Sequence, residues 1–332
     1  IHKEENMKAI EVSEFGNSNV LKYKELKDPV MKDDEIYVSL KAAAVNPVET
    51  YVRQGTYAQL PSLPYIPGKD GAGIVKAVGA QVKNFKVGDR VFVTVESDAQ
   101  FGTYAQAITC KATEVTLLPE IMTYSQGAAL GSSGLTALYA LKQKAGLKSG
   151  EYILIHGATG GVGTLVLQFA KLYGAKVIAT AGSEKGLEIL KKLGADYVFN
   201  HHAEGYIERI PDLTKDHGLD VIIEMLANVN LQKDLDAIGN NGRIVIIGNR
   251  GEVTINPRVL MMKGAHITGL MLANITPEEV EENTHLLLQG LSEGVKPVVD
   301  KVFPLEQAAT AQDYIMENKG SLGKIILDTA AE

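Results

Sequence analysis

The stretch His156-Gly157-Ala158-Thr159-Gly160-Gly161-Val162-Gly163 decides the fold, because it joins a hydrophobic segment at residues 152–155 to an amphipathic helical pattern at residues 164–172. Glycines at this spacing permit a tight turn, let a pyrophosphate approach main-chain N–H groups, and let the helix pack closely on the strand. The spacing is Gly-x-x-Gly-x-x-Gly, so the turn alone does not separate a nucleotide site from an ordinary strand-to-helix turn. The elements around it decide between the two.

Short β-branched segments alternate with helical periods through the rest of this region. Strands are expected at residues 176–180, 197–199, 220–225 and 243–247, and helices at residues 184–193, 204–213 and 231–238. Residues 265–272 can supply a sixth strand. This alternation predicts an α/β fold, a doubly wound parallel sheet of the Rossmann type, over residues 128–273.

The residues before 128 have a different pattern, with short alternating strands at 8–12, 35–43, 71–78 and 90–95 between Gly and Pro turns. After residue 273, a helix at 277–290, a strand at 302–303, a helix at 305–318 and a strand at 324–327 are expected. We predict one β-rich domain, residues 1–127 and 274–332, interrupted by the nucleotide domain, with the reaction in the cleft between them. Met7 resembles a natural start, so residues 1–6 are expected to be an added or disordered extension.

The composition fits a two-domain cytoplasmic enzyme. The chain has 332 residues, a net charge of -7 and a pI near 5.6, which argue against a dedicated nucleic-acid binder. Its single cysteine, Cys110, excludes an intrachain disulfide framework and indicates a reducing compartment. The sequence has neither an apolar run of transmembrane length nor a signal-peptide pattern at its start.

The segment after the second expected strand predicts which nicotinamide cofactor binds. An NAD site usually places a carboxylate there for the ribose 2′-hydroxyl, whereas an NADP site offers cationic or hydroxyl groups to the 2′-phosphate. Here Gly182 leaves space, Ser183 can donate a hydrogen bond, and Lys185 can bring an ammonium group. We interpret Glu184 as a carboxylate in the first turn of a helix capped by Ser183, and a solvated surface lysine is the alternative for Lys185. The segment predicts NADPH.

Further motifs are spread from about residue 8 to residue 327. They read Asn46-Pro47-Val48-Glu49-Thr50-Tyr51, Gly55-Thr56-Tyr57, Pro67-Gly68-Lys69-Asp70-Gly71-Ala72-Gly73, Glu224-Met225-Leu226-Ala227-Asn228-Val229-Asn230 and Ile255-Asn256-Pro257-Arg258. With the glycine turn, they resemble the medium-chain dehydrogenase/reductase superfamily and, within it, the quinone oxidoreductase branch that includes the zeta-crystallins. The resemblance implies a GroES-like catalytic domain and NADPH-dependent, zinc-independent reduction of quinones.

The zinc ligands of the superfamily's alcohol dehydrogenases have no counterparts here. Around the place where a ligating cysteine would fall the sequence reads Val45-Asn46-Pro47-Val48, and Lys69-Asp70 stands where the histidine would fall. Cys110 cannot build a structural zinc site alone. We therefore expect no metal. Without a Lewis acid to ionise an alcohol, an electrophilic quinone or enone is the better substrate, because its developing oxyanion needs only hydrogen-bond donors.

The resemblance also implies the site residues. Asn46 and Tyr51 are the catalytic candidates, with Tyr51 also contacting the nicotinamide; a turn residue and a core phenol are the alternatives. Ser132 and Ser133 are candidates for the substrate pocket, in a segment where zeta-crystallins carry a proline and two aromatics, and a flexible hinge is the alternative. The remaining cofactor contacts are expected at Thr136, Thr159, Gly160, Gly161, Val162, Gly182, Ser183, Lys185, His201 on the adenine side, Asn230, Ile247, Gly248, Asn249, Arg250 (with a surface arginine as the alternative), Leu270, Met271 and Leu272.

Two other functions stay open at this level. An NADPH-dependent alkenal or enone reductase would share the fold and cofactor, and zeta-crystallins are also known as lens proteins and binders of AU-rich RNA. The aromatic content of 6% and the acidic balance offer RNA no stacking platform or basic stripe. The apolar strand expected at residues 265–272 would lie at a sheet edge, and such an edge must be covered, so a homodimer or homotetramer is expected.

Overall fold

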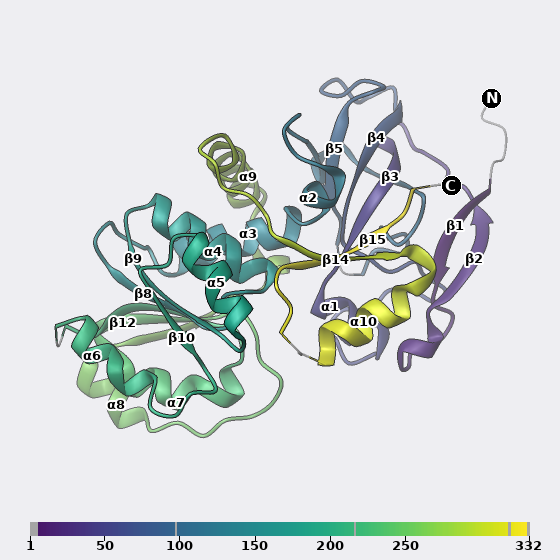
Figure 1. Cartoon of the computed structure of the whole chain (residues 1–332). Helices are drawn as coiled ribbons and strands as arrows, with labels where there is room; N and C mark the ends of the chain where they lie inside the picture. The colour runs from purple at the N-terminus through teal and green to yellow at the C-terminus, as the bar shows by residue number, and fades with distance from the viewer. Residues whose placement is uncertain (1–5, 97, 216, 318–319, 331–332) are drawn as a thin grey trace. The chain divides into compact units, whose positions relative to one another are not determined.

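The computed structural model describes residues 6–96, 98–215, 217–317 and 320–330. The chain forms two compact units, which we call unit 1 (residues 1–132 and 297–332) and unit 2 (residues 133–296). Figure 1 follows the chain by colour, from the purple N-terminal strands of unit 1 through the green elements of unit 2 to the yellow C-terminal elements of unit 1. Of the extension expected at residues 1–6, residues 1–5 lie outside the described residues, whereas Asn6 begins a strand and pairs with Lys27.

Unit 2 is built around a six-stranded parallel sheet in the order β10-β9-β8-β11-β12-β13, which confirms the predicted doubly wound fold. The order reverses between β8 and β11, and doubly wound sheets bind ligands in the crevice at the carboxyl ends of the strands at such a point. The strands are β8 (Tyr152–Ile155), β9 (Lys176–Ala181), β10 (Tyr197–Asn200), β11 (Leu219–Glu224), β12 (Ile238–Ile246) and β13 (His266–Gly269).

Helices surround this sheet and bury their apolar faces on it. Leu231 and Leu235 of α7, for example, pack in one core cluster with Ile222 of β11 and Ile244 of β12. The helices associated with unit 2 are α3 (Gly131–Tyr139), α4 (Gly161–Leu172), α5 (Glu184–Lys192), α6 (Ile210–Leu213), α7 (Ala227–Ala237), α8 (Pro257–Lys263) and α9 (Pro277–Ser292).

Several elements begin or end away from the predicted residues. Helix α4 begins at Gly161 instead of residue 164, because the glycine turn already enters the helix. A Cβ on Gly163 would lie 2.7 Å from the Cα of Ala158, so glycine is needed for this close approach. Strand β13 covers only four residues of the predicted 265–272, and the helix predicted at 204–213 is a 3₁₀ turn (Ile207–Arg209) followed by the short α6.

Unit 1 contains a seven-stranded sheet path, β14-β15-β3-β4-β5-β7, with β6 paired to β3, and a separate hairpin of β1 and β2. The antiparallel strands β2, β6 and β7 are additions to the prediction; β2 is almost wholly exposed and so lacks the alternating pattern. The strands are β1 (Asn6–Glu11), β2 (Lys22–Lys27), β3 (Glu35–Val45), β4 (Asp70–Val78), β5 (Arg90–Thr94), β6 (Ala107–Lys111), β7 (Val115–Leu117), β14 (Val299–Pro304) and β15 (Lys324–Asp328). The helices are α1 (Pro47–Arg53), α2 (Tyr124–Ala128) and α10 (Ala308–Glu317).

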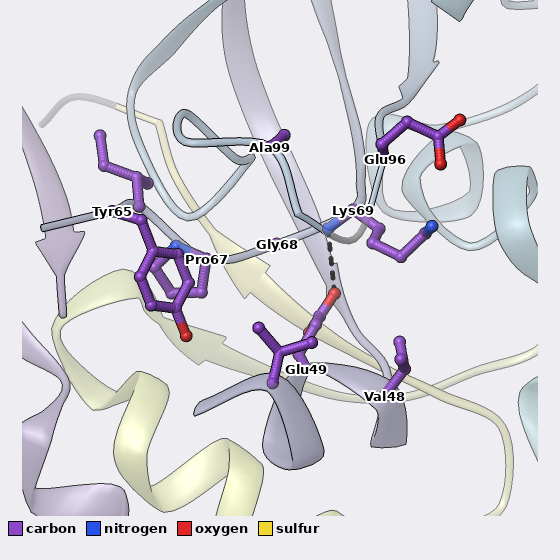
Figure 2. Close-up of a pocket in the computed structure, with 10 residues that line it drawn as sticks. Val48, Glu49, Tyr65, Pro67, Gly68, Lys69, Glu96 and Ala99 are labelled. Carbon is purple, nitrogen blue, oxygen red and sulfur yellow. Dashed lines mark hydrogen bonds between the residues drawn. The ribbon is translucent and has the colours of Figure 1, made fainter. Parts of the chain in front are cut away.

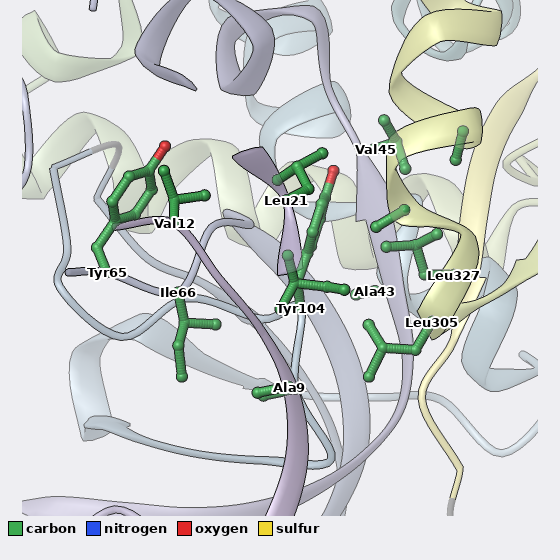
Figure 3. Packing of buried hydrophobic residues seen from close by; sticks show 14 of the residues in the cluster. Ala9, Val12, Leu21, Ala43, Val45, Tyr65, Ile66, Tyr104, Leu305 and Leu327 are labelled. Carbon is green, nitrogen blue, oxygen red and sulfur yellow. The ribbon is translucent and has the colours of Figure 1, made fainter. Parts of the chain in front are cut away.

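The end of the chain is part of the core of unit 1. Strand β15 pairs antiparallel with β3, with Ile325 opposite Val45. Figure 3 shows Val45 and Leu327 with Leu305 and Tyr104, which belong to one buried cluster with residues of β1. This packing joins segments from both ends of the sequence around a single core.

The two units differ from the predicted domains at both boundaries, and helix α9 lies in the larger difference. Residues 274–332 were predicted in the first domain, but residues up to Lys296 belong to unit 2. Residues 128–132 were predicted in the nucleotide domain, but they belong to unit 1. A Cβ on Gly290 of α9 would lie 2.3 Å from Cε1 of Phe169 in α4, and one on Gly134 of α3 would lie 2.8 Å from Leu287. The amphipathic pattern of α9 predicts a helix but not the unit that covers its apolar face. In the described part of the chain, no helix combines the length and apolar character needed to span a membrane.

Candidate active site

The glycine turn presents the free end of a helix at the carboxyl edge of the unit 2 sheet. Gly160 is the N-cap of α4 and has no side-chain capping bond, so the N–H groups of the first turn are not covered by a side chain. The N–H of Gly157 donates to Oγ1 of Thr180 at 3.1 Å, which ties the turn to β9. Thr159 is buried and Val162 is half-buried beside it. A helix end of this kind binds anions through its N–H groups and its dipole.

The residues predicted for the 2′-phosphate and adenine lie together after β9 and β10. Ser183 is the N-cap of α5, and its Oγ accepts from the N–H of Gly186 at 3.1 Å, as predicted from the sequence. A Cβ on Gly182 would lie 2.9 Å from Nε2 of His201, so this glycine allows the histidine to approach the strand end. Lys185 is exposed in the first turn of α5. The local arrangement leaves the Ser183 hydroxyl hydrogen and the Lys185 ammonium available to an anion.

A second group of predicted contacts lies at the ends of β11 and β12. Nδ2 of Asn230 donates to Oε1 of Glu224 at 3.2 Å, and the N–H of Ile247 donates to the Glu224 carbonyl at 2.8 Å. A Cβ on Gly248 would lie 2.2 Å from the carbonyl oxygen of Met225, so only glycine permits the two chain segments to cross here. Glu224 therefore accepts hydrogen bonds from Asn230 and Ile247, two predicted cofactor contacts that lie in different segments of the chain.

The remaining predicted contacts of unit 2 are less enclosed. Nδ2 of Asn249 donates to the carbonyl of Gly251 at 2.7 Å, and the Arg250 guanidinium has no ion pair within the described ranges. Leu270, Met271 and Leu272 follow β13, and Thr136 is buried in α3. These positions stay predictions as cofactor contacts.

Asn46 lies at the centre of a buried polar network in unit 1. Its Nδ2 donates to Oε1 of Glu49 at 3.0 Å and to Oδ2 of Asp70 at 2.8 Å, and its Oδ1 accepts from Nζ of Lys324. Both amide hydrogens are therefore engaged by carboxylates. These bonds favour Asn46 as a residue that positions its neighbours rather than as a hydrogen-bond donor to substrate.

The strand register explains this network. Because Ile325 pairs with Val45 in antiparallel strands, the next pair would place Lys324 across from Asn46. Asp70 begins β4, on the other side of β3. Three adjacent strands thus bring together an amide, a carboxylate and an ammonium group that are far apart in sequence.

Glu49 has a full set of donors. Its carboxylate accepts from the N–H groups of Asn46 and Lys69 at 2.9 and 3.0 Å, and from the Tyr104 hydroxyl at 2.5 Å. Figure 2 shows the Lys69 bond beside a cavity of about 10 Å³, which has room for about one water molecule and none for a quinone. Burial raises the pKa of Glu49, whereas these hydrogen bonds oppose the shift.

Lys324 carries the positive charge of this network. Its side chain is 6% exposed, and burial lowers the pKa of its ammonium group while the charges of Asp70 and Glu49 raise it. The sequence analysis missed Lys324, since it belongs to an ordinary closing strand and lies 278 residues from Asn46. Only an expectation that two buried carboxylates need a cation could have drawn attention to it.

Ser132 and Ser133 are buried, which does not match a flexible hinge. The N–H and Oγ of Ser132 both donate to Oδ1 of Asp70, at 2.8 and 3.0 Å. Oγ1 of Thr94 donates to the same oxygen at 3.0 Å. The Ser132 hydroxyl hydrogen is thus used by Asp70 and is not available to a substrate carbonyl.

Tyr51 differs from its neighbours. It lies in α1, is half-buried, and its hydroxyl has no hydrogen-bond partner among the residues that the structure describes. The alternative, a core phenol with its hydroxyl satisfied elsewhere, is therefore not favoured. Tyr51 keeps a free donor for a ligand.

The donor set of this region does not fit zinc. Cys110 is buried in β6 within an apolar cluster, and burial raises the pKa of its thiol well above the usual range. Asn46 and Asp70 are joined directly to each other, with Lys324 as the adjoining cation. Zinc sites of the superfamily that the sequence resembles need thiolate and imidazole ligands, and Asn46, Asp70 and Lys324 supply neither.

A histidine and two acids in unit 2 form a separate group that sequence spacing did not reveal. His156, Glu224 and Asp234 are all buried, and one ligand atom from each lies within 4.8 Å of the others. They come from the glycine turn, the end of β11 and helix α7.

Family models and relatives of known name match nearly the whole chain. A family model described as "Alcohol dehydrogenase GroES-like domain" matches residues 32–147, and one described as "Zinc-binding dehydrogenase" matches residues 161–289. The chain is 45% identical over 323 residues to a quinone oxidoreductase of Sus scrofa, and 44% identical to that of Homo sapiens, with 97% of each chain covered. It is 33% identical to quinone oxidoreductase 1 of Escherichia coli, over 96% of this chain and 98% of that one.

Solved structures agree with this fold. An Escherichia coli quinone oxidoreductase complexed with NADPH has a TM-score of 0.86 and 32% identity, covering 97% of this chain and 99% of that one. An NAD-dependent alcohol dehydrogenase has a TM-score of 0.91 and 29% identity, covering 98% and 100%. The predicted combination of a Rossmann fold and a GroES-like domain is confirmed.

Replacing Lys324 with methionine tests the charge balance around Asn46. The Lys324→Met variant should lose about 3–5 kcal/mol of stability at pH 8, because Asp70 and Glu49 would stay buried without their cation. Part of the loss should be recovered near pH 5, where a proton can neutralise Glu49, whose pKa burial raises. Chemical denaturation followed by circular dichroism at both pH values measures this.

The control is Lys76→Met, which removes an exposed lysine from β4 of the same sheet. It should change the free energy of unfolding by less than about 0.5 kcal/mol at either pH. Equal losses in the two variants, or a Lys324→Met loss that does not depend on pH, would contradict the assignment.

Proposed function

Because this chain belongs to the quinone oxidoreductase branch of the medium-chain dehydrogenase/reductase superfamily, we propose that it reduces quinones with NADPH. The observation that carries this proposal is the uncapped end of α4 at the β8/β11 crevice, beside a β9 end that bears Ser183 and Lys185. These groups fit a pyrophosphate and a 2′-phosphate.

NADPH, when bound, supplies the hydride, and the residues of the chain bind and orient the reactants. The N–H groups at Gly161 and Val162 hold the pyrophosphate, and the Ser183 hydroxyl donates to the 2′-phosphate while Lys185 neutralises its charge. His201 lies on the adenine side, and Asn230 and Gly248 belong to the ribose and nicotinamide side. We propose the other predicted contacts of unit 2 in the same roles.

Tyr51 is the proposed orienting residue at the substrate end. Its hydroxyl can donate to an oxygen of the quinone, or orient the nicotinamide, because no protein group among those described engages it. Asn46 contributes indirectly, since it holds Glu49, Asp70 and Lys324 in one network beside α1. A quinone accepts hydride without a Lewis acid, so we propose a zinc-independent reaction.

Steady-state assays test the proposed activity. With NADPH, 1,2-naphthoquinone and 9,10-phenanthrenequinone should be reduced with a higher kcat/KM than a simple enone, because the quinones are the better hydride acceptors. Prior treatment with a chelator should leave the rates unchanged. Faster reduction of the enone would favour the alkenal/enone reductase instead, and activity lost to the chelator and restored by zinc would refute the metal-free mechanism.

Cofactor choice depends on Lys185 in this proposal. The Lys185→Ala variant should raise the dissociation constant of NADPH about 10- to 100-fold, because a charge-assisted phosphate contact contributes about 1.5–3 kcal/mol. Its affinity for NADH should stay unchanged. Quenching of intrinsic tyrosine fluorescence or calorimetric titration measures both constants.

The matched control is Lys192→Ala, an exposed lysine in the last turn of the same helix. It should leave both dissociation constants unchanged. A wild-type protein with equal affinity for NADPH and NADH would contradict the proposed binding of the 2′-phosphate by Ser183 and Lys185.

We also propose a homodimer or homotetramer and a cytoplasmic location. Strand β13 pairs with β12 and ends the sheet, and Met261 and Met262 before it are 80% and 78% exposed. An edge with such neighbours is covered most simply by a second copy across a two-fold axis. The location rests on the single cysteine, which needs no oxidising compartment.

A proline substitution at Ile267 tests whether the β13 edge of the sheet pairs with a second copy of the chain. The Ile267→Pro variant should sediment as monomers or aggregates, because proline cannot donate to a ladder of β-sheet hydrogen bonds. Ile267→Val, which keeps the N–H and the β-branched shape, should assemble like the wild type. Analytical ultracentrifugation at micromolar concentration distinguishes these outcomes, and a monomeric wild type would show that the edge is capped in another way.

A further inference from the structure

Three buried side chains lie at the carboxyl ends of β8 and β11 and on the neighbouring helix α7 of unit 2. His156 follows the last residue of β8, Glu224 is the last residue of β11, and Asp234 lies in α7. The sheet order reverses between β8 and β11, so the group occupies the place where a doubly wound sheet binds its ligand. Their exposed fractions are 3%, 0% and 0%, so solvent does not reach them.

The group of His156, Glu224 and Asp234 has more hydrogen-bond acceptors than donors. Nε2 of His156 lies 2.7 Å from Oδ1 of Asp234 and 3.6 Å from Oε2 of Glu224. Oε2 of Glu224 and Oδ2 of Asp234 are buried, and no protein N–H or other fixed donor serves them. One carboxylate oxygen of Glu224 nevertheless lies within 4.8 Å of one of Asp234, and a hydrogen bond between the two side chains contributes to the pKa of both acids. A proton held between them supplies the missing donor.

The surrounding charges favour that proton. Burial and the neighbouring Asp234 carboxyl together raise the pKa of Glu224 to about 8. Burial also raises the pKa of Asp234, whereas the hydrogen bond with Glu224 and the charge of Lys233 lower it. His156 has a lowered pKa through burial and stays neutral, with Glu224 opposing this shift. The other titratable groups that interact with the group are Tyr206, whose pKa is raised by burial and then by these two acids, and His201, whose pKa is lowered by burial, by His202 and by His156.

Glu224 also holds the backbone on one side of the crevice. Its Oε1 accepts from the N–H of Leu226 and from Nδ2 of Asn230, and its carbonyl accepts from the N–H of Ile247. On the other side, Asp234 binds His156, the residue that begins the glycine turn. The acid pair thus joins the two segments that flank the proposed cofactor site.

We propose that Glu224 and Asp234 share one proton and, with His156, act as positioning residues that hold the glycine turn and the segment at residues 226–230 in the conformation that binds NADPH. Loss of the proton leaves two adjacent buried charges in the group, which separates the carboxyl groups and loosens both segments. NADPH affinity therefore falls as the pH rises through the titration of the pair. This inference rests on the proposed function for its cofactor.

A divalent metal is the competing occupant of the three ligand atoms. Zinc at about 2.0–2.2 Å from each ligand in tetrahedral geometry would keep neighbouring ligand atoms about 3.4 Å apart. The 2.7 Å distance between Nε2 of His156 and Oδ1 of Asp234 is instead that of a direct hydrogen bond. The geometry favours a proton over a metal ion.

The first experiment measures the NADPH dissociation constant between pH 7 and pH 9.5 without any quinone. For the wild type it should rise above about pH 8 by up to about tenfold per pH unit, the limit for one required proton. Glu224→Gln has a side chain of the same shape that does not titrate, so its dissociation constant should lose this dependence on pH. Glu188→Gln, on the exposed face of α5, is the control and should follow the wild type throughout.

Wild-type and Glu224→Gln profiles that rise in parallel would overturn the proposal. Asp234→Asn provides a second test if Glu224→Gln does not fold, because it too removes one of the two charges and should flatten the profile. One equivalent of divalent metal per purified chain would also overturn the proposal, since the site would then hold no shared proton.

Infrared difference spectroscopy separates this inference from the proposed function. The wild-type protein without cofactor should show a carboxylic-acid C=O band at pH 7 that disappears by pH 9.5 and is absent from Glu224→Gln. If the protein failed to bind NADPH but showed this band, the proposed function would fail while the shared proton stood. NADPH binding without the band would refute the shared proton alone.

Discussion

The cost of burying carboxylates constrains both units of this protein. In unit 1, Glu49 and Asp70 lie in the interior, and isolated charges there would be prohibitively unfavourable. The ammonium of Lys324 and the amide of Asn46 make them tolerable, so β15 must return from the end of the chain to β3. The geometry of the segment from Asn46 to Tyr51 depends on that return.

Unit 2 meets the same constraint with different chemistry. Glu224 and Asp234 have a neutral histidine beside them and, among the residues that the structure describes, no buried cation, and the raised pKa of each acid favours a bound proton. A cation stabilises its partners over a wide pH range, whereas a proton leaves when the pH rises. The network of unit 1 is therefore suited to fixed structure, and the acid pair of unit 2 makes its region sensitive to pH.

The local elements of unit 2 followed directly from the sequence. Alternating strand and helix patterns predicted all six strands of the sheet, because each buried parallel strand is apolar and each helix has its own period. Ser183 was predicted as a helix N-cap, and the structure confirms its capping bond. The exposed β2 and the extent of β13 were not predicted well, since edge strands lack the pattern that burial imposes on both faces.

By itself, the sequence determined the fold class, the glycine turn proposed to bind the cofactor phosphates and the residue types available for the 2′-phosphate, because these depend on neighbours within a few positions. Tertiary structure alone decided that Asn46 has no free donor, that Lys324 joins it, that α9 packs in unit 2, and that His156 meets Glu224 and Asp234. These facts arise from strand register and helix packing between segments far apart in the chain. Their energies come from burial and charge at contacts that no local pattern specifies.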